Sequence, residues 1–141
     1  MDKFNVLKIA LGEYGNKGVL GVGENLSVLN YFAEIGHEWV KDDDTAWCAA
    51  FLNWVLKKAG MPHTGSLLAR SFLNYGTKTE YPLIGDIVVL WRVSRASAFG
   101  HVGLFISETA DTIFMLAGNN NNQVNITEFP KSKLLEYRKI T

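Results

Sequence analysis

The chain changes its hydrophobic period at Pro82. Before Pro82, apolar residues recur at intervals of three and four, which is typical of helices, whereas short β-branched and aromatic runs separated by polar turns follow it. The helical spacing predicts helices over residues 4–11, 25–35, 45–59 and 66–75. The later runs predict strands over residues 86–91, 102–107, 112–116, 124–127 and 135–140. Helices followed by strands predict an α+β domain, in which N-terminal helices pack on a C-terminal antiparallel sheet of about five strands.

Length and composition restrict the class of protein further. The 141 residues predict a single domain spanning 1–141, and 48% apolar residues can fill its core without disulfides or metal. Fourteen basic and fourteen acidic residues cancel, so we expect no nucleic-acid partner and no anionic membrane surface. The sequence contains no apolar run of about 18 residues, and Met1 to Asn16 is too charged for an export signal. We therefore expect neither a membrane span nor a signal peptide.

Cys48, the single cysteine, lies near the predicted start of the third helix. Asp42 to Asp44 and a capping Thr45 suit the positive end of the helix dipole. Cys48 shares its helical stripe with Phe51 and Val55, so one interpretation is that the thiol is a small buried hydrophobe. The other interpretation follows from its place in the first turn, where the dipole and unpaired N–H groups lower a thiol pKa and bind an oxyanion.

His101 begins a predicted strand. Alternation places His101, Gly103 and Phe105 on one face, and the missing side chain of Gly103 would let a helix end approach that face. We therefore predict that this face meets the helix of Cys48. The alternative is that His101 is an ordinary polar residue at a sheet edge. His37 and His63 have no ligand spacing with Cys48, so we expect no metal site and no cofactor.

Three motifs carry a family resemblance: Trp47 to Phe51 (WCAAF), Pro82 to Val88 (PLIGDIV) and Gly100 to Ile106 (GHVGLFI). In this order they resemble the NlpC-like and CHAP group of papain-like cysteine peptidases and amidases, mostly bacterial and phage enzymes that cut amide bonds in peptidoglycan. Many NlpC-like members have an acidic residue before the cysteine and a serine after it, where this chain has Trp47 and Ala49. Substrate preferences tied to those neighbours are therefore not carried over.

The resemblance implies a role for each site residue. Cys48 would attack an amide carbonyl, and His101 would be its base and then the acid for the leaving amine. A third polar residue orients the histidine in this family, and Asn119 matches its position best, with Asn120 or Asn121 as alternatives if the strand ends later. The backbone N–H of Cys48 is the expected oxyanion donor. Trp47 and Trp91 either wall the cleft and bind substrate or pack in the core.

Three hypotheses about function follow. The first is a peptidoglycan amidase or endopeptidase acting on the stem peptide. The second keeps the fold but makes the chain a protease, deamidase or transglutaminase acting on proteins. The third is a binding module with a vestigial dyad. Without an export signal, an enzyme of the first kind would be made in the cytoplasm and reach the wall after phage lysis or by specialised secretion. A secreted effector would be expected to have an immunity protein as partner.

Overall fold

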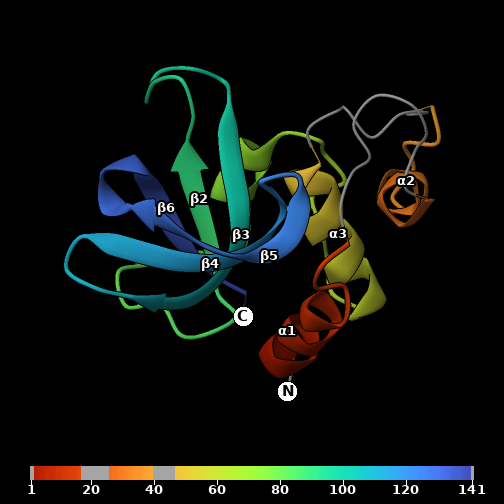
Figure 1. Cartoon of the computed structure of the whole chain (residues 1–141), viewed down its shortest axis with the longest axis horizontal. Helices are drawn as coiled ribbons and strands as arrows, with labels where there is room; N and C mark the ends of the chain where they lie inside the picture. Colours follow the sequence, from red (N-terminus) through yellow and green to blue (C-terminus); the bar gives the residue numbers. More distant parts are fainter. Residues whose placement is uncertain (1, 17–25, 40–46, 141) are drawn as a thin grey trace.

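The computed structural model of the chain describes residues 2–16, 26–39 and 47–140 (Figure 1). Its helices are α1 (Asp2–Gly12), α2 (Leu26–Ala33), α3 (Cys48–Lys58) and the short 3-10 helices η1 (Ala69–Asn74) and η2 (Lys131–Lys133). Its strands are β1 (Thr77–Thr79), β2 (Ile87–Trp91), β3 (Gly100–Glu108), β4 (Thr112–Asn120), β5 (Gln123–Pro130) and β6 (Leu134–Lys139). None of the helices in the described part of the chain is both long and apolar enough to cross a membrane.

The strands form one antiparallel sheet in the order β1-β6-β2-β3-β4-β5. Strands β2 to β5 are consecutive neighbours, and β6 returns to the other side of β2. The α+β prediction is confirmed, with helices preceding a sheet of six strands rather than about five. The additional strand, β1, is only three residues long, which is too short for a period of two to be recognised in the sequence.

Two predicted helices differ from the observed ones. The segment predicted over 66–75 contains the six-residue 3-10 helix η1, in which the N–H of Ser71 bonds the carbonyl of Leu68, three residues earlier. A segment this short is commonly 3-10, because it can complete few α-helical bonds. The third helix begins at Cys48, with Trp47 in the N-cap position. The predicted cap Thr45 and the acidic residues before it lie outside the described residues.

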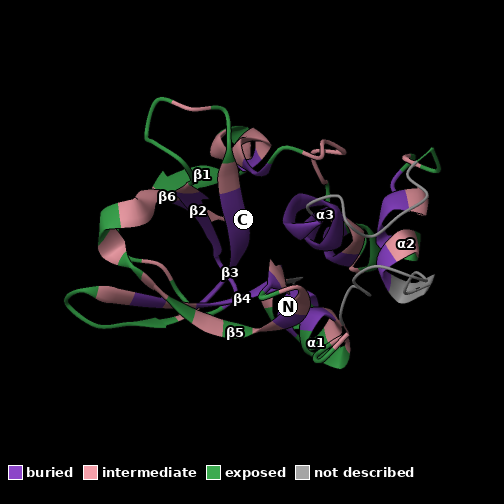
Figure 2. Cartoon of the chain, turned by 45° about the horizontal axis from the view of Figure 1, so that its top comes forward, coloured by how far each residue is buried: buried purple, intermediate pink, exposed green. Residues whose placement is uncertain are grey.

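Helices α1, α2, α3 and η1 lie on one face of the curved sheet, and α3 lies between the sheet and α2 (Figures 1 and 2). Helix α3 is buried along most of its length, and it shares one apolar cluster with Val102 and Leu104 of β3. The opposite face of the sheet forms a second cluster, which includes Phe105 and Ala117. The two clusters place the first turn of α3 next to β3 and β4.

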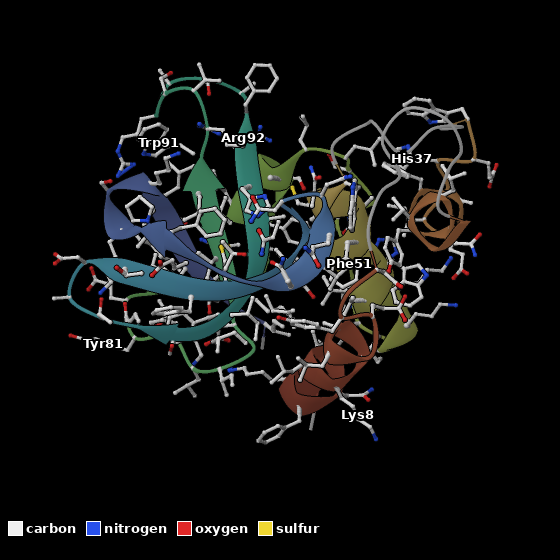
Figure 3. The ribbon with its side chains drawn as sticks, in the orientation of Figure 1. Lys8, His37, Phe51, Tyr81, Trp91 and Arg92 are labelled. Carbon is white, nitrogen blue, oxygen red and sulfur yellow. The ribbon has the colours of Figure 1, made fainter. Side chains whose placement is uncertain are left out.

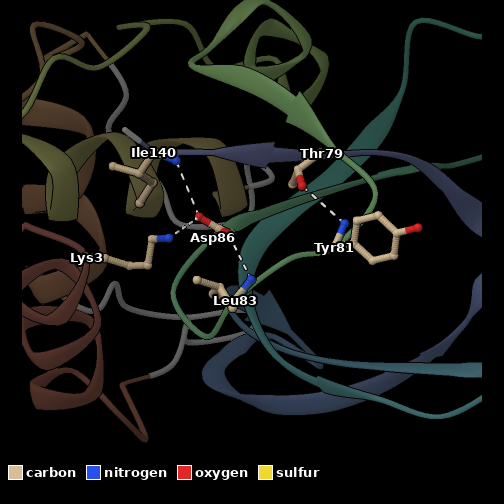
Figure 4. Close-up of polar contacts among 6 residues, drawn as sticks. All are labelled: Lys3, Thr79, Tyr81, Leu83, Asp86 and Ile140. Carbon is tan, nitrogen blue, oxygen red and sulfur yellow. Dashed lines mark hydrogen bonds and ion pairs between the residues drawn. The ribbon is translucent and has the colours of Figure 1, made fainter.

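A buried carboxylate holds the two ends of the described chain together. Asp86, which is wholly buried just before β2, lies 2.8 Å from the Nζ of Lys3 in α1. Asp86 also accepts hydrogen bonds from the N–H groups of Leu83, at 2.8 Å, and Ile140, at 3.4 Å (Figure 4). The carboxylate therefore connects α1, the start of β2 and the residue that follows β6.

Candidate active site

Cys48 occupies the first position of α3. The first bond of the helix runs from the N–H of Phe51 to the carbonyl of Trp47, at 2.9 Å. The N–H groups of Cys48 and the two alanines after it therefore precede the helical bonding pattern, and they form the positive end of the dipole. Only 3% of the Cys48 surface is exposed. Cys48 is therefore both buried, as its place on the apolar stripe predicted, and located in the first turn of the helix, as the second interpretation requires.

Strands β3 and β4 separate from each other where the first turn of α3 reaches the sheet. Strands β3 and β4 pair from Leu104 and Leu116 outward, whereas the earlier residues of β3 pair with β2 on the other side. On β4, a Cβ added to Gly118 would lie only 2.7 Å from the Cβ of Phe51 in α3. On β3, the N–H of Val102 bonds the sulfur of Cys48. The first turn of α3 therefore lies against both strands where their ladder has ended.

The prediction about which face of β3 meets the helix is wrong. The missing side chain of Gly103 makes room for β4, because a Cβ there would lie 2.6 Å from the Cβ of Ala117. The helix packs on the face of Val102, and Phe105 lies on the other face. His101 nevertheless reaches Cys48, because the helix end approaches the parted end of the strands, where a side chain of the far face is within reach.

His101 lies between the thiol and an asparagine. Its Nε2 is 2.6 Å from the Oδ1 of Asn120, whose Nδ2 donates to the carbonyls of Met115, at 3.4 Å, and Asn125, at 3.0 Å. These two acceptors fix the orientation of the amide, so Oδ1 faces the imidazole and Nε2 must carry the proton. The nitrogen left for the hydrogen bond between His101 and Cys48 is Nδ1.

The asparagine that contacts the imidazole is Asn120, whereas the sequence favoured Asn119. Gly118 and Asn119 together stand opposite Val124 of β5, which makes a β-bulge. Regular alternation would put Asn119 on the face of Ala117, and the extra residue gives that place to Asn120. Asn119 itself has a φ of 61°. The strand also ends later than predicted, and the two asparagines that follow, with φ of 51° and 63°, form a tight hairpin turn.

Burial and the neighbouring charges shift the pKa values of Cys48 and His101 in opposite directions. Burial acts to raise the pKa of the Cys48 thiol, but the charge of His101 and hydrogen bonds from His101, Val102 and Ala49 outweigh it, so the pKa lies below its usual range. Burial acts to lower the pKa of His101, but the charge of Cys48 and bonds to Cys48 and Asn120 raise it. The arrangement therefore stabilises a thiolate–imidazolium pair, which is the nucleophilic state of a cysteine.

The two tryptophans differ in their access to solvent. Trp47 is wholly buried, and its Nε1 donates to the Oδ1 of Asn122 at 3.4 Å, which agrees with packing in the core, one of the two roles that the sequence left open for it. Trp91, at the end of β2, is half-buried and lines an open cavity of about 340 Å³. His101, Asn119 and Asn120 line the same cavity.

The cavity also reveals residues that the sequence did not single out. Arg92 and Lys133 line it, together with Phe129 of β5, whose ring centroid lies 5.3 Å from that of His101. Arg92 and Lys133 are far apart in the chain, and only the return of β6 beside β2 brings them to one cavity. Their sequence neighbourhood contains no signal that would have paired them.

Neither a protein-family model nor a curated protein matches this sequence. Solved structures do match its fold. NlpC1 from Trichomonas vaginalis superposes with a TM-score of 0.59 at 16% identity, over 99% of this chain and 44% of that protein. The fold is that of the NlpC/P60 structures. An NLP/P60-family protein similar to lipoprotein, from Staphylococcus aureus subsp. aureus Mu50, gives 0.55 at 15% identity, over 99% of this chain and 42% of that one.

A third NlpC/P60 structure is close to this chain in length. The P60 domain of an antigen from M. avium subspecies paratuberculosis gives a TM-score of 0.55 at 13% identity, and 99% of this chain covers 94% of that domain. The chain thus spans less than half of the first two structures and almost all of the third. These likenesses bear out the resemblance stated from the motifs at the level of the fold.

Proposed function

We propose that this chain is a cysteine hydrolase that cleaves an amide bond in the stem peptide of peptidoglycan. The observation that carries the proposal is the line of contacts from Cys48 through His101 to Asn120, at the start of a helix. The NlpC/P60 fold supports the choice of substrate, because that fold accompanies the motifs whose resemblance implies cell-wall hydrolysis.

Acylation uses the ion pair. The thiolate of Cys48 attacks the amide carbon, and the carbonyl oxygen becomes an oxyanion that the N–H of Cys48 at the helix end stabilises. The imidazolium of His101 gives its Nδ1 proton to the amide nitrogen, the C–N bond breaks, and the amine leaves. The products of this half-reaction are a thioester on Cys48 and a neutral imidazole.

Deacylation reverses the role of the histidine. Nδ1 of His101 takes a proton from a water molecule as the water oxygen attacks the thioester carbon. The C–S bond then breaks, the acid product leaves, and thiolate and imidazolium are restored. Throughout the cycle Asn120 accepts from Nε2–H, so the proton that moves is always the one at Nδ1.

The route to the wall belongs to the same proposal. We propose release by phage lysis or delivery by a specialised secretion machine, and in the second case an immunity protein that covers the site. Co-purification of the tagged chain from the producing cell tests for this partner directly, and a chain that recovers no bound protein would contradict it.

Digestion of purified peptidoglycan tests the proposed activity. Wild type is expected to release fragments with new amino ends, read by mass spectrometry, and the position of those ends separates an amidase from an endopeptidase. Cys48→Ala, with the same fold by circular dichroism, is expected to release none. Sacculi that stay intact with wild type, or that Cys48→Ala digests equally well, would refute the proposal.

A further inference from the structure

The cavity beside the proposed catalytic pair contacts the histidine and not the cysteine. His101 and Asn120 line it, whereas Cys48 does not. In amide cleavage the acyl carbon bonds to sulfur, and the leaving nitrogen takes its proton from the imidazole. A cavity on the histidine side is therefore placed to receive the leaving amine rather than the acyl group.

The cavity carries positive charge. Arg92 and Lys133 line it, and among the residues that the structure describes no carboxylate forms an ion pair with either of them. Thr127 and Phe129 also line it, and alternation along β5 turns Glu128, which stands between them, to the other face. The two cations therefore face the cavity without a neutralising partner in the described chain.

Both cations are placed close to the chemistry. The charge of Arg92 acts on the His101 imidazole and opposes its protonation. The Nζ of Lys133 lies 5.5 Å from the ring centre of Trp91, a cation–π distance that holds the ammonium over the indole. Trp91 and Arg92 are neighbours at the end of β2 (Figure 3, upper left). The indole N–H donates to the carbonyl of Ser132, at 3.0 Å, which fixes the ring.

We propose that this cavity binds a carboxylate on the leaving-amine side of the substrate, with Arg92 and Lys133 as its anion-binding residues and Trp91 as its apolar wall. The inference rests on the proposed hydrolase function, because it assigns the two sides of the cleaved bond. Guanidinium and ammonium groups are the usual partners of carboxylates, and charge-assisted hydrogen bonds of this kind discriminate strongly between a carboxylate and its neutral amide.

A binding experiment tests the cavity without requiring turnover. L-lysyl-D-alanine and its C-terminal amide, which differ only in the carboxylate, are titrated into the Cys48→Ala variant of the 141-residue chain. The indole N–H resonance of Trp91 reports occupancy by NMR. We expect the acid to bind about tenfold more tightly than the amide. Equal affinities, or shifts that leave the Trp91 resonance unmoved, would overturn the inference.

Variants that remove one or both positive charges test which residues cause the preference for the acid over the amide. Arg92→Gln and Lys133→Gln, in the same Cys48→Ala background, are each expected to lower the acid-to-amide ratio by at least threefold, and the double variant to abolish it. Lys78→Gln, on exposed β1, removes one positive charge away from the cavity and is expected to keep the full ratio. A ratio that survives in the double variant would overturn the assignment.

Turnover separates this inference from the proposed function. The stem-peptide fragment that wild type cleaves is made with the carboxylate of the leaving residue free or amidated. We expect the free acid to be cleaved about tenfold faster in kcat/KM, the Arg92→Gln, Lys133→Gln double variant to lose that acid-to-amide ratio, and Lys78→Gln to keep it. If the chain cleaves peptidoglycan but shows no preference for the free acid, the carboxylate site is overturned and the hydrolase function stands. If the cavity binds the carboxylate at Trp91 but the chain does not cleave peptidoglycan, the hydrolase function is overturned instead.

Discussion

At the scale of single residues, the site depends on hydrogen bonds that fix protons. The two carbonyls around the Nδ2 of Asn120 orient its amide, the amide selects the protonated nitrogen of His101, and the remaining nitrogen faces the thiol. The sulfur receives N–H groups from two elements, α3 and β3. A buried thiol would otherwise stay neutral, so these contacts decide its reactivity.

Replacing the histidine is expected to reverse the shift at the thiol. In wild type the pKa of Cys48 lies below its usual range, so the thiolate absorbance in the ultraviolet should develop at a pH below the ordinary thiol value of about 8.5. In His101→Ala the lowering charge and hydrogen bond of His101 are gone and burial remains, so the transition should move upward. A transition at the same pH in both proteins would contradict the ion pair.

Asn120 and Asn119 can be distinguished in the same titration. Asn120→Ala removes the acceptor at Nε2, so the pKa of His101 should fall and the thiolate transition should move to higher pH. Misplacement of the imidazole should also lower kcat on peptidoglycan by about a hundredfold, the loss typical of a ~1 Å displacement. Asn119→Ala should leave the thiolate transition in place. A shift with Asn119→Ala and none with Asn120→Ala would restore the residue first predicted from the sequence.

At the scale of elements, the site exists because a helix end meets parted strands. The bulge in β4 moves Asn120 onto the face of His101, and the end of the β3–β4 ladder admits the first turn of α3. Gly118 is the point of closest approach, since an added Cβ would lie 2.7 Å from the Cβ of Phe51 and 2.9 Å from the Cε3 of Trp47.

Gly118→Ala is therefore expected to displace the first turn of α3. Overpacking of this kind costs about 1–3 kcal/mol, and the displaced Cys48 should lose most of its activity. Urea unfolding and peptidoglycan turnover measure the two effects. Gly12→Ala is the matched control, because an added Cβ there meets nothing within 4 Å, and its stability should be unchanged or slightly higher. Equal stability and turnover in the two variants would contradict the close approach.

Sequence reasoning predicted the elements better than their junctions. The change of period at Pro82 separates helices from strands because each period follows from which face is buried. A bulge adds one residue without any change of composition, so alternation could not distinguish Asn119 from Asn120. The prediction of which face of β3 meets the helix was wrong for a related reason. A glycine indicates close approach but not the partner, and at Gly103 that partner is β4.

At the scale of the whole molecule, distant segments of the chain meet at two places. The proposed site combines the start of α3 with β3 and β4, while Asp86 connects α1, β2 and the residue after β6. Helix α1 contributes Val6 and Ala10 to the apolar cluster that α3 shares, so the position of Cys48 depends on α1 staying attached to the sheet. The Lys3–Asp86 pair is the polar part of that attachment.

Asp86→Ala is expected to destabilise the fold by about 3–5 kcal/mol, as removal of one partner from a buried ion pair does, because it leaves the N–H groups of Leu83 and Ile140 without their acceptor. Urea unfolding followed by tryptophan fluorescence measures the loss. Lys58→Ala is the control, because it breaks the exposed pair with Glu34, where side chains are 45% and 37% exposed, and it should cost at most about 1 kcal/mol. Lys3→Ala should approach the cost of Asp86→Ala, since the carboxylate would then be buried without a cation. If Asp86→Ala unfolds at the same urea concentration as Lys58→Ala, the buried pair is not what holds α1 to the sheet.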